Sequence, residues 1–139
     1  MPVEETGNML IMTTAIAIVD GNADYAAKHW EILTAWSNYL AEAGMDPENQ
    51  LCTEDFAGHL AHNANLSAKA IMAIAGYGRL AEMLNKPEEA KKFTEMAKRM
   101  AIEWERRADD GDHYRLAFDM PGTWSQKYNF VWDKVLGLN

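Results

Sequence analysis

Charged residues are unevenly spread along the chain, and their pattern predicts helices of two kinds. Residues 8–19 carry no charge, which is typical of a helix buried on all sides. In residues 23–43 apolar side chains recur every three or four positions with charged ones between them, as on a helix with one solvent face. The same two kinds then repeat. The expected helices cover residues 8–19, 23–43 and 64–84, the segment from Pro87 up to Asp109, and a last stretch from near Ser125.

The order buried, amphipathic, buried, amphipathic, buried predicts an all-α fold with little strand. This alternation is typical of an α/α toroid, in which inner helices line a ring and outer helices face solvent. We therefore expect a single domain, residues 1–139, that forms a partial (α/α)6 toroid of about two and a half helical hairpins. A closed ring of five to seven hairpins needs roughly 300 residues or more. The chain is therefore expected to be a fragment of a larger catalytic domain.

Three polar clusters stand directly before the buried helices, at residues 4–8, 55–65 and 122–129. Each cluster ends in an asparagine: Asn8, Asn65 and Asn129. Their spacing is too long for one short repeat unit but suits long helical hairpins. Because the inner helices of such an array are parallel, polar residues at their N-termini lie on the same face of the array. The sequence therefore predicts a site at that face.

Composition excludes several classes of partner. The formal net charge of −8 argues against a nucleic acid, because phosphate binding needs a basic surface. The apolar run 9–19 is too short to cross a bilayer, so no membrane partner is expected. Cys52 is the only cysteine, so no intramolecular disulfide can form. The start of the chain carries acidic residues and no basic region, so it does not read as a signal peptide.

Motifs in the second and third clusters resemble the helical domain of glutaminase A-like proteins, a fungal and bacterial family whose members are often secreted. The resemblance rests on the segments 55–67, 111–116 and 121–129 and covers nearly the whole chain. It implies an (α/α)6 toroid of the six-hairpin glycosidase type, a β-rich region elsewhere in the parent protein, and a secreted or periplasmic location. It also implies hydrolysis of the side-chain amide of glutamine, or of a glycoside by analogy of fold. The alternative function is a non-catalytic helical-repeat binding module.

Carboxylates before the inner helices are the candidate catalytic groups. Glu4, Glu5 and Asp55 can each serve as general acid or base, and Glu5 and Asp55 are the predicted catalytic residues. The alternative is helix capping, since acidic residues near a helix N-terminus are favoured by the macrodipole. Cys52 is either a nucleophile or a small buried hydrophobe.

The remaining polar and aromatic residues of the clusters are the candidate substrate contacts. His59 and His62 can share a helical face, but no third ligand has a defined spacing to them, so no metal is predicted and no cofactor is expected. The aromatic side chains suit stacking on a substrate or ordinary core packing. The predicted substrate-binding residues are His59, His62, Asn63, Asn65, Trp124, Gln126, Lys127 and Asn129.

Partners follow from the incomplete ring. The expected partners are a small-molecule substrate in the parent protein and its remaining hairpins and β-rich region. Apolar faces of residues 9–19 and 130–138 are expected to be exposed, and large exposed apolar patches favour association. We therefore expect a homodimer formed through these edges. The isolated chain is expected to be inactive, because catalysis needs groups held in a fixed mutual geometry.

Overall fold

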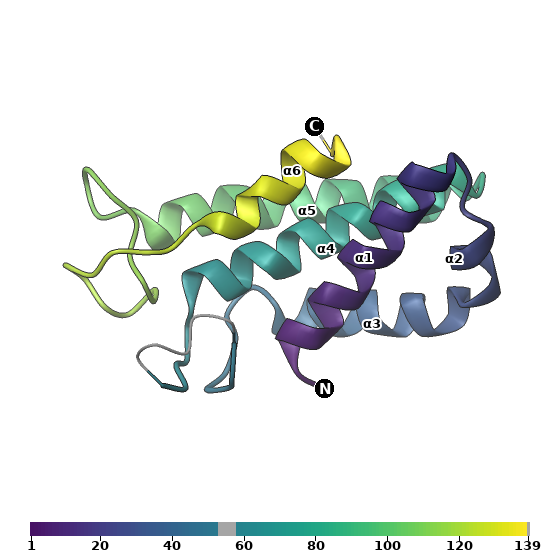
Figure 1. Ribbon diagram of the computed structural model, residues 1–139. Coiled ribbons are helices and arrows are strands. Elements are labelled where there is room, and N and C mark those ends of the chain that lie inside the picture. Colours follow the sequence, from purple (N-terminus) through teal and green to yellow (C-terminus); the bar gives the residue numbers. More distant parts are fainter. Residues whose placement is uncertain (53–57, 139) are drawn as a thin grey trace.

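The computed structural model describes residues 1–52 and 58–138, and every regular element in these ranges is helical. The helices are α1 (Val3–Asp20), α2 (Asp24–Lys28), α3 (Trp30–Ala43), α4 (Ala64–Met83), α5 (Pro87–Ala108), the 3-10 helix η2 (Tyr128–Phe130) and α6 (Val131–Leu136). Extended pairing in these ranges is limited to isolated bridges. Helices α1, α3, α5, η2 and α6 pack against α4, which lies at the centre (Figure 1), and α2 packs against α1 and α3. The all-α prediction is confirmed.

Helices α1 and α4 run in the same direction and pack closely through glycines. A side-chain carbon added to Gly7 would meet Lys69, and one added to Gly76 would meet Thr14 at 2.7 Å. A residue early in α1 thus contacts the early part of α4, and a later residue of α1 contacts a later part of α4, so the two helices are parallel. Because glycine has no side chain, the two backbones approach one another more closely than larger residues would allow.

Helix α6 runs in the same direction as α1 and α4. Asn129, which precedes it, is hydrogen-bonded to Asn65 near the start of α4. Leu138, which follows it, lines a cleft with Ala75, further along α4. Thus α1, α4 and α6 are three roughly parallel helices, as expected for the inner layer of a hairpin array (Figure 1).

Helix α5 runs against α4 and forms a hairpin with it. Near the turn of the hairpin, a side chain on Gly78 would meet Thr94. At the other end, the indole nitrogen of Trp104 donates a hydrogen bond of 2.6 Å to the carbonyl of Ala64. Helix α3 also runs against α4, since Thr34 near its start is hydrogen-bonded to Tyr77. These antiparallel pairs agree with the predicted hairpins.

Burial agrees with the prediction for α4 but not for α1. In α4, 15 of 20 residues are buried, as expected for an inner helix. In α1 only 9 of 18 are buried, and Met12 and Val19 are 57% and 85% exposed. The prediction that residues 8–19 are covered on all sides is therefore wrong for the described part of the chain. The helix is buried where it faces α4 and open on its other side.

Two helix boundaries in the first half differ from the prediction. Helix α1 begins at Val3 rather than at residue 8, so Glu4 and Glu5 lie in its first turn, where the helix dipole favours acidic side chains. The segment 23–43 is not one helix, because it is interrupted at His29 between α2 and α3.

The last helix also begins later than expected. Regular helix starts at Val131, after η2, rather than near Ser125. The backbone nitrogen of Ser125 instead donates a hydrogen bond of 2.7 Å to the carbonyl of Tyr114. This contact holds the segment before η2 against the loop that follows α5. Among the described residues, no helix is long and apolar enough to cross a lipid bilayer.

Candidate functional site

The starts of α1, α4 and η2 lie at the same end of the molecule. The backbone nitrogen of Val3 donates a hydrogen bond of 2.7 Å to the side chain of Gln50, in the loop that leads to α4. The side-chain nitrogen of Asn129 donates one of 3.0 Å to the carbonyl of Asn65. The starts of the inner helices, with the polar residues in or before their first turns, therefore lie at one end of the molecule as far as the structure describes them.

Backbone hydrogen bonds join the loop before α4 to the loop after α5 at this end. The nitrogen of Ala64 donates to the carbonyl of Leu116 (3.0 Å), and the nitrogen of Phe118 donates to the carbonyl of His62 (2.9 Å). The nitrogen of His62 donates to the carbonyl of Pro47 (2.8 Å). His62 is thus fixed through both its backbone groups.

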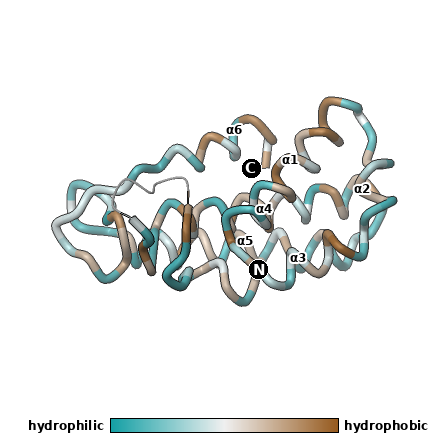
Figure 2. Tube along the Cα trace, turned by 60° about the horizontal axis from the view of Figure 1, so that its bottom comes forward, coloured by the Kyte–Doolittle hydropathy of each residue, from teal (hydrophilic) through white to brown (hydrophobic). Residues whose placement is uncertain are grey.

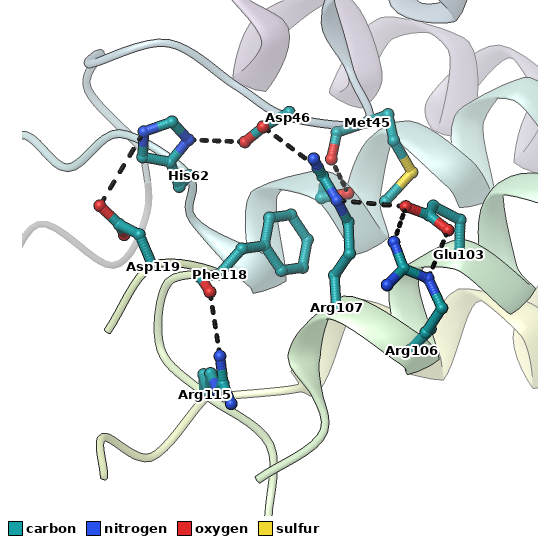
Figure 3. A network of polar contacts seen from close by, with 10 residues as sticks. Met45, Asp46, His62, Glu103, Arg106, Arg107, Arg115, Phe118 and Asp119 are labelled. Atoms are coloured by element: carbon teal, nitrogen blue, oxygen red, sulfur yellow. Dashed lines mark hydrogen bonds and ion pairs between the residues drawn. The ribbon is translucent and has the colours of Figure 1, made fainter. Parts of the chain in front are cut away.

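The side chain of His62 belongs to a network of charged groups that extends to α5 (Figure 3). Its Nδ1 lies 2.7 Å from a carboxylate oxygen of Asp46. The other oxygen of Asp46 lies 3.1 Å from Arg107, whose Nε lies 3.2 Å from Glu103. Because an ionised carboxylate only accepts hydrogen bonds, Nδ1 of His62 carries the proton. In the neutral ring Nε2 then has the free lone pair, which can accept a proton.

Nε2 of His62 is accessible from solvent. The His62 side chain is 43% exposed, and its Nε2 lies 4.0 Å from a carboxylate oxygen of Asp119, beyond hydrogen-bond length. Figure 3 shows Asp46 and Asp119 on opposite sides of the imidazole ring. A small polar molecule can therefore approach the ring at Nε2.

The backbone of His62 is in the left-handed region, with φ of 61°. Few residues other than glycine adopt this conformation, and holding one there costs on the order of 1–3 kcal/mol. The backbone bonds of His62 and its contact with Asp46 maintain it. In this conformation the imidazole lies beside Asp46 (Figure 3).

The contact between His62 and Asp46 changes the pKa of both side chains. The hydrogen bond to Asp46 raises the pKa of His62 above its ordinary 6.5, against the opposing effect of burial. Burial would raise the pKa of Asp46, but the hydrogen bond from His62 and the charge of Arg107 outweigh it and lower that pKa below 3.8. The pair therefore favours the ion pair over the neutral forms.

Two of the predicted aromatic and basic residues lie in the loop after α5. Trp124 is 67% exposed and stacks on His113, with ring centroids 4.0 Å apart. The ammonium of Lys127 lies 4.9 Å from the centre of the Tyr114 ring. One face of Trp124 thus packs on the protein while much of the ring remains accessible to solvent.

Three of the predicted asparagines are buried and hydrogen-bonded within the protein. Asn63 caps α4, because its side-chain oxygen accepts a hydrogen bond of 2.8 Å from the nitrogen of Leu66. Asn65 and Asn129 are bonded to one another. These contacts hold the start of α4 against η2, and a role of these residues in substrate binding stays a prediction.

The other predicted residues fall in different places. Glu5 and His59 are exposed, as is Gln126, and they are not part of the network around His62 that the structure describes. Asp55, the second predicted catalytic residue, lies outside the described residues. Glu4, which stands beside Glu5, is buried and ion-paired with Lys69 of α4.

Asp46, Arg107 and Asp119 were not identified as site residues from the sequence. Asp46 and Asp119 each lie in a turn with a proline close by, and such turns usually give acidic residues a purely local role. Arg107 reads as one charge on the polar face of an amphipathic helix. Only the folding of two distant loops against α5 brings these side chains together. Among the described residues, no cluster of three or more His, Cys, Asp or Glu side chains is arranged to hold a metal ion.

Comparison with known families gives a match over the whole chain. Residues 1–139 match the family described as the glutaminase A six helical-hairpin domain. The chain belongs to this family. The family resemblance inferred from the sequence motifs is thereby confirmed, and the parallel inner helices and antiparallel hairpins of the structure agree with part of a six-hairpin domain.

Two fungal proteins show the same relationship. Glutaminase A of Aspergillus oryzae is 36% identical over 143 residues, which cover 100% of this chain and 21% of that protein. A probable glutaminase of Arthroderma benhamiae is 32% identical over 114 residues, covering 81% of this chain and 13% of that protein. The chain thus spans about a fifth or less of the length of these relatives of the glutaminase A family.

Proposed function

We propose that this chain is the part of a glutaminase that carries one wall of its active site, and that the whole protein hydrolyses the side-chain amide of glutamine. The observation that carries the proposal is the 36% identity with glutaminase A of Aspergillus oryzae along the entire chain. The position of the polar helix starts at one end of the molecule supports it.

His62 and Asp46 have the chemistry that amide hydrolysis requires. Water adds to the amide carbon, the bond from carbon to nitrogen breaks, and the nitrogen must gain a proton to leave as ammonia. In the proposal, Nε2 of His62 takes the proton from water and delivers it to the leaving nitrogen. Asp46 accepts the hydrogen bond from Nδ1, which orients the ring and stabilises its charged form.

Other residues at this end have supporting roles in the proposal. Glu5, on the exposed side of the first turn of α1, and Asp55 are candidates for a second acid or base. The exposed side chains of Trp124, Gln126 and Lys127 are candidates for substrate contacts. They lie in the same loop as Asp119, which flanks Nε2 of His62.

The test is a chimera of glutaminase A from Aspergillus oryzae in which this chain replaces the segment that it matches. Ammonia release from L-glutamine is measured for the chimera and for the isolated 139-residue chain. We expect turnover by the chimera and none by the isolated chain, because the other walls of the site are needed to hold substrate and exclude water.

Folding is checked by circular dichroism and by a cooperative thermal transition. A folded chimera that releases no ammonia would contradict the proposal. Robust turnover by the isolated chain would contradict the claim that the site needs further walls. Peptide binding by the chimera without any hydrolysis would favour the alternative, a helical-repeat binding module.

A further inference from the structure

A stripe of large apolar side chains is exposed along the outer side of α1. Met9, Met12, Ile16 and Val19 are 42%, 57%, 39% and 85% exposed. Their spacing of three and four residues places them on one face of the helix. Figure 2 shows hydrophobic stretches of α1 and α6 along the same edge of the molecule. A continuous apolar face of this kind marks a contact surface rather than a solvent surface.

The outer helices have the opposite character. In α5 the exposed face is formed largely by charged residues, such as Lys91, Lys98 and Arg99, and Ile102 is the one large apolar side chain exposed among them. In α1 no charged residue occurs between Glu5 and Asp20. The exposed side of α1 therefore has the composition of an interface, whereas that of α5 has the composition of a solvent face.

Helix α4 shows what an inner helix looks like when both its flanks are covered. It contacts α1 as well as η2 and α6, and 15 of its 20 residues are buried. Helix α1 is as free of charge as α4 but only 9 of its 18 residues are buried. Helix α1 therefore has an uncovered side that α4 does not have.

We infer that the stripe Met9, Met12, Ile16 and Val19 is the docking face for an inner helix of another hairpin of the same six-hairpin domain. The family description has six hairpins, the described residues supply α1–α3, α4–α5 and the start of a third, and glutaminase A is several times longer than this chain. The inference rests on family membership and not on the proposed hydrolysis of glutamine.

The contact between α1 and α4 indicates the chemistry of the partner. There, Lys69 lies over Gly7 and Thr14 lies over Gly76, so each larger side chain meets a position without one. By the same pattern, the partner helix carries glycine or alanine opposite Met12 and Ile16. It runs parallel to α1, as α4 does.

Thiol labelling in two contexts tests the inference. Met12→Cys and Ile102→Cys are made in the isolated chain, at a concentration where it is monomeric, and in the chimera described above. The native Cys52 is buried, and the unmodified chain gives its background rate. We expect Met12→Cys to react on the order of tenfold more slowly in the chimera, because labelling then needs local opening, and Ile102→Cys to react equally in both.

Equal labelling rates of Met12→Cys in the isolated chain and in the chimera would overturn the inference. Protection that disappears when the chimera is diluted would also overturn it, since it would show a second copy on this face.

A second measurement does not need a folded chimera. The tagged chain is co-expressed with glutaminase A of Aspergillus oryzae that lacks its matching segment, and the complex is purified on the tag. The unmodified chain and the Ile102→Glu control are expected to recover the partner, and Met12→Glu is not. Both substitutions introduce a charge at an exposed position, so neither should unfold the chain. Failure of the unmodified chain to recover the partner, or equal recovery by Met12→Glu, would contradict the inference.

Discussion

A carboxylate oxygen of Asp46 lies 2.7 Å from Nδ1 of His62, although the two residues are 16 positions apart. The contact joins the loop after α3 to the residue just before the cap of α4. It fixes the ring of a histidine whose backbone is already in the left-handed region. The pair therefore holds the loop end in place, and in the proposed function it is the group that transfers the proton.

The ion pair predicts a specific dependence of stability on pH. The pKa of His62 is raised above 6.5, so its contribution is complete below that pH and is lost as the pH rises through the raised value. The pKa of Asp46 is lowered below 3.8, so its contribution is complete above that pH and is lost as the pH falls through the lowered value. The pair stabilises the fold most between these limits.

His62→Gln should therefore lower the unfolding midpoint more near pH 5 than near pH 8. Urea unfolding of both chains at the two pH values gives the comparison. Asp46 keeps its contact with Arg107 in either chain, so the difference isolates the histidine. A loss of stability that is the same at both pH values would show that the charge on His62 does not contribute.

Much of the fold could be predicted from the sequence because burial and local signals agree there. The nearly uncharged segment 64–84 predicted the central helix α4, and Pro87 marks the first turn of α5. The site was predicted only in part. His62 was identified from its cluster, but nothing in the sequence links it to Asp46, or Asp46 to Arg107 on the polar face of α5. An uncharged helix such as α1 also looks the same in sequence whether its neighbour is present or not.

Gly76→Ala should destabilise the chain by about 1–3 kcal/mol. The added carbon would lie 2.7 Å from Oγ1 of Thr14, a fully buried side chain that is held by a hydrogen bond to the carbonyl of Leu10. Helix propensity alone predicts the opposite, an increase of up to about 1 kcal/mol in the free energy of unfolding, because alanine favours helix more than glycine does. Urea unfolding decides between them, and Thr14→Ala in the same chain should recover part of the loss. A more stable Gly76→Ala chain would contradict the close packing of α1 on α4.

Lys69→Met should cost about 3–5 kcal/mol, because it removes the cation of a buried ion pair with Glu4. Replacing both residues, as Lys69→Met with Glu4→Leu, should restore much of the stability, since no buried charge remains. The free energies of unfolding of the two single variants and the double variant complete the cycle. Additive losses would show that the two side chains do not interact.

The isolated chain should form dimers at high concentration. With no other hairpin present, the apolar stripe that contains Met12 and Val19 is open to a second copy, and association removes it from water. Sedimentation equilibrium should show a dimer for the unmodified chain and for Ile102→Glu, and a monomer for Met12→Glu. A strict monomer at every concentration would argue against this surface as a self-association site.

The most direct measurement of the proposed role of His62 is the turnover of glutamine by the chimera with His62→Gln. We predict that kcat falls on the order of a hundredfold or more, as for the loss of a proton-transfer group, and that Asp46→Asn lowers it in the same direction. Arg79→Gln, which breaks an exposed ion pair with Glu82 at the far end of α4, should leave kcat unchanged. If the folded His62→Gln chimera releases ammonia as fast as its parent, His62 is not the proton carrier and the proposed site is contradicted.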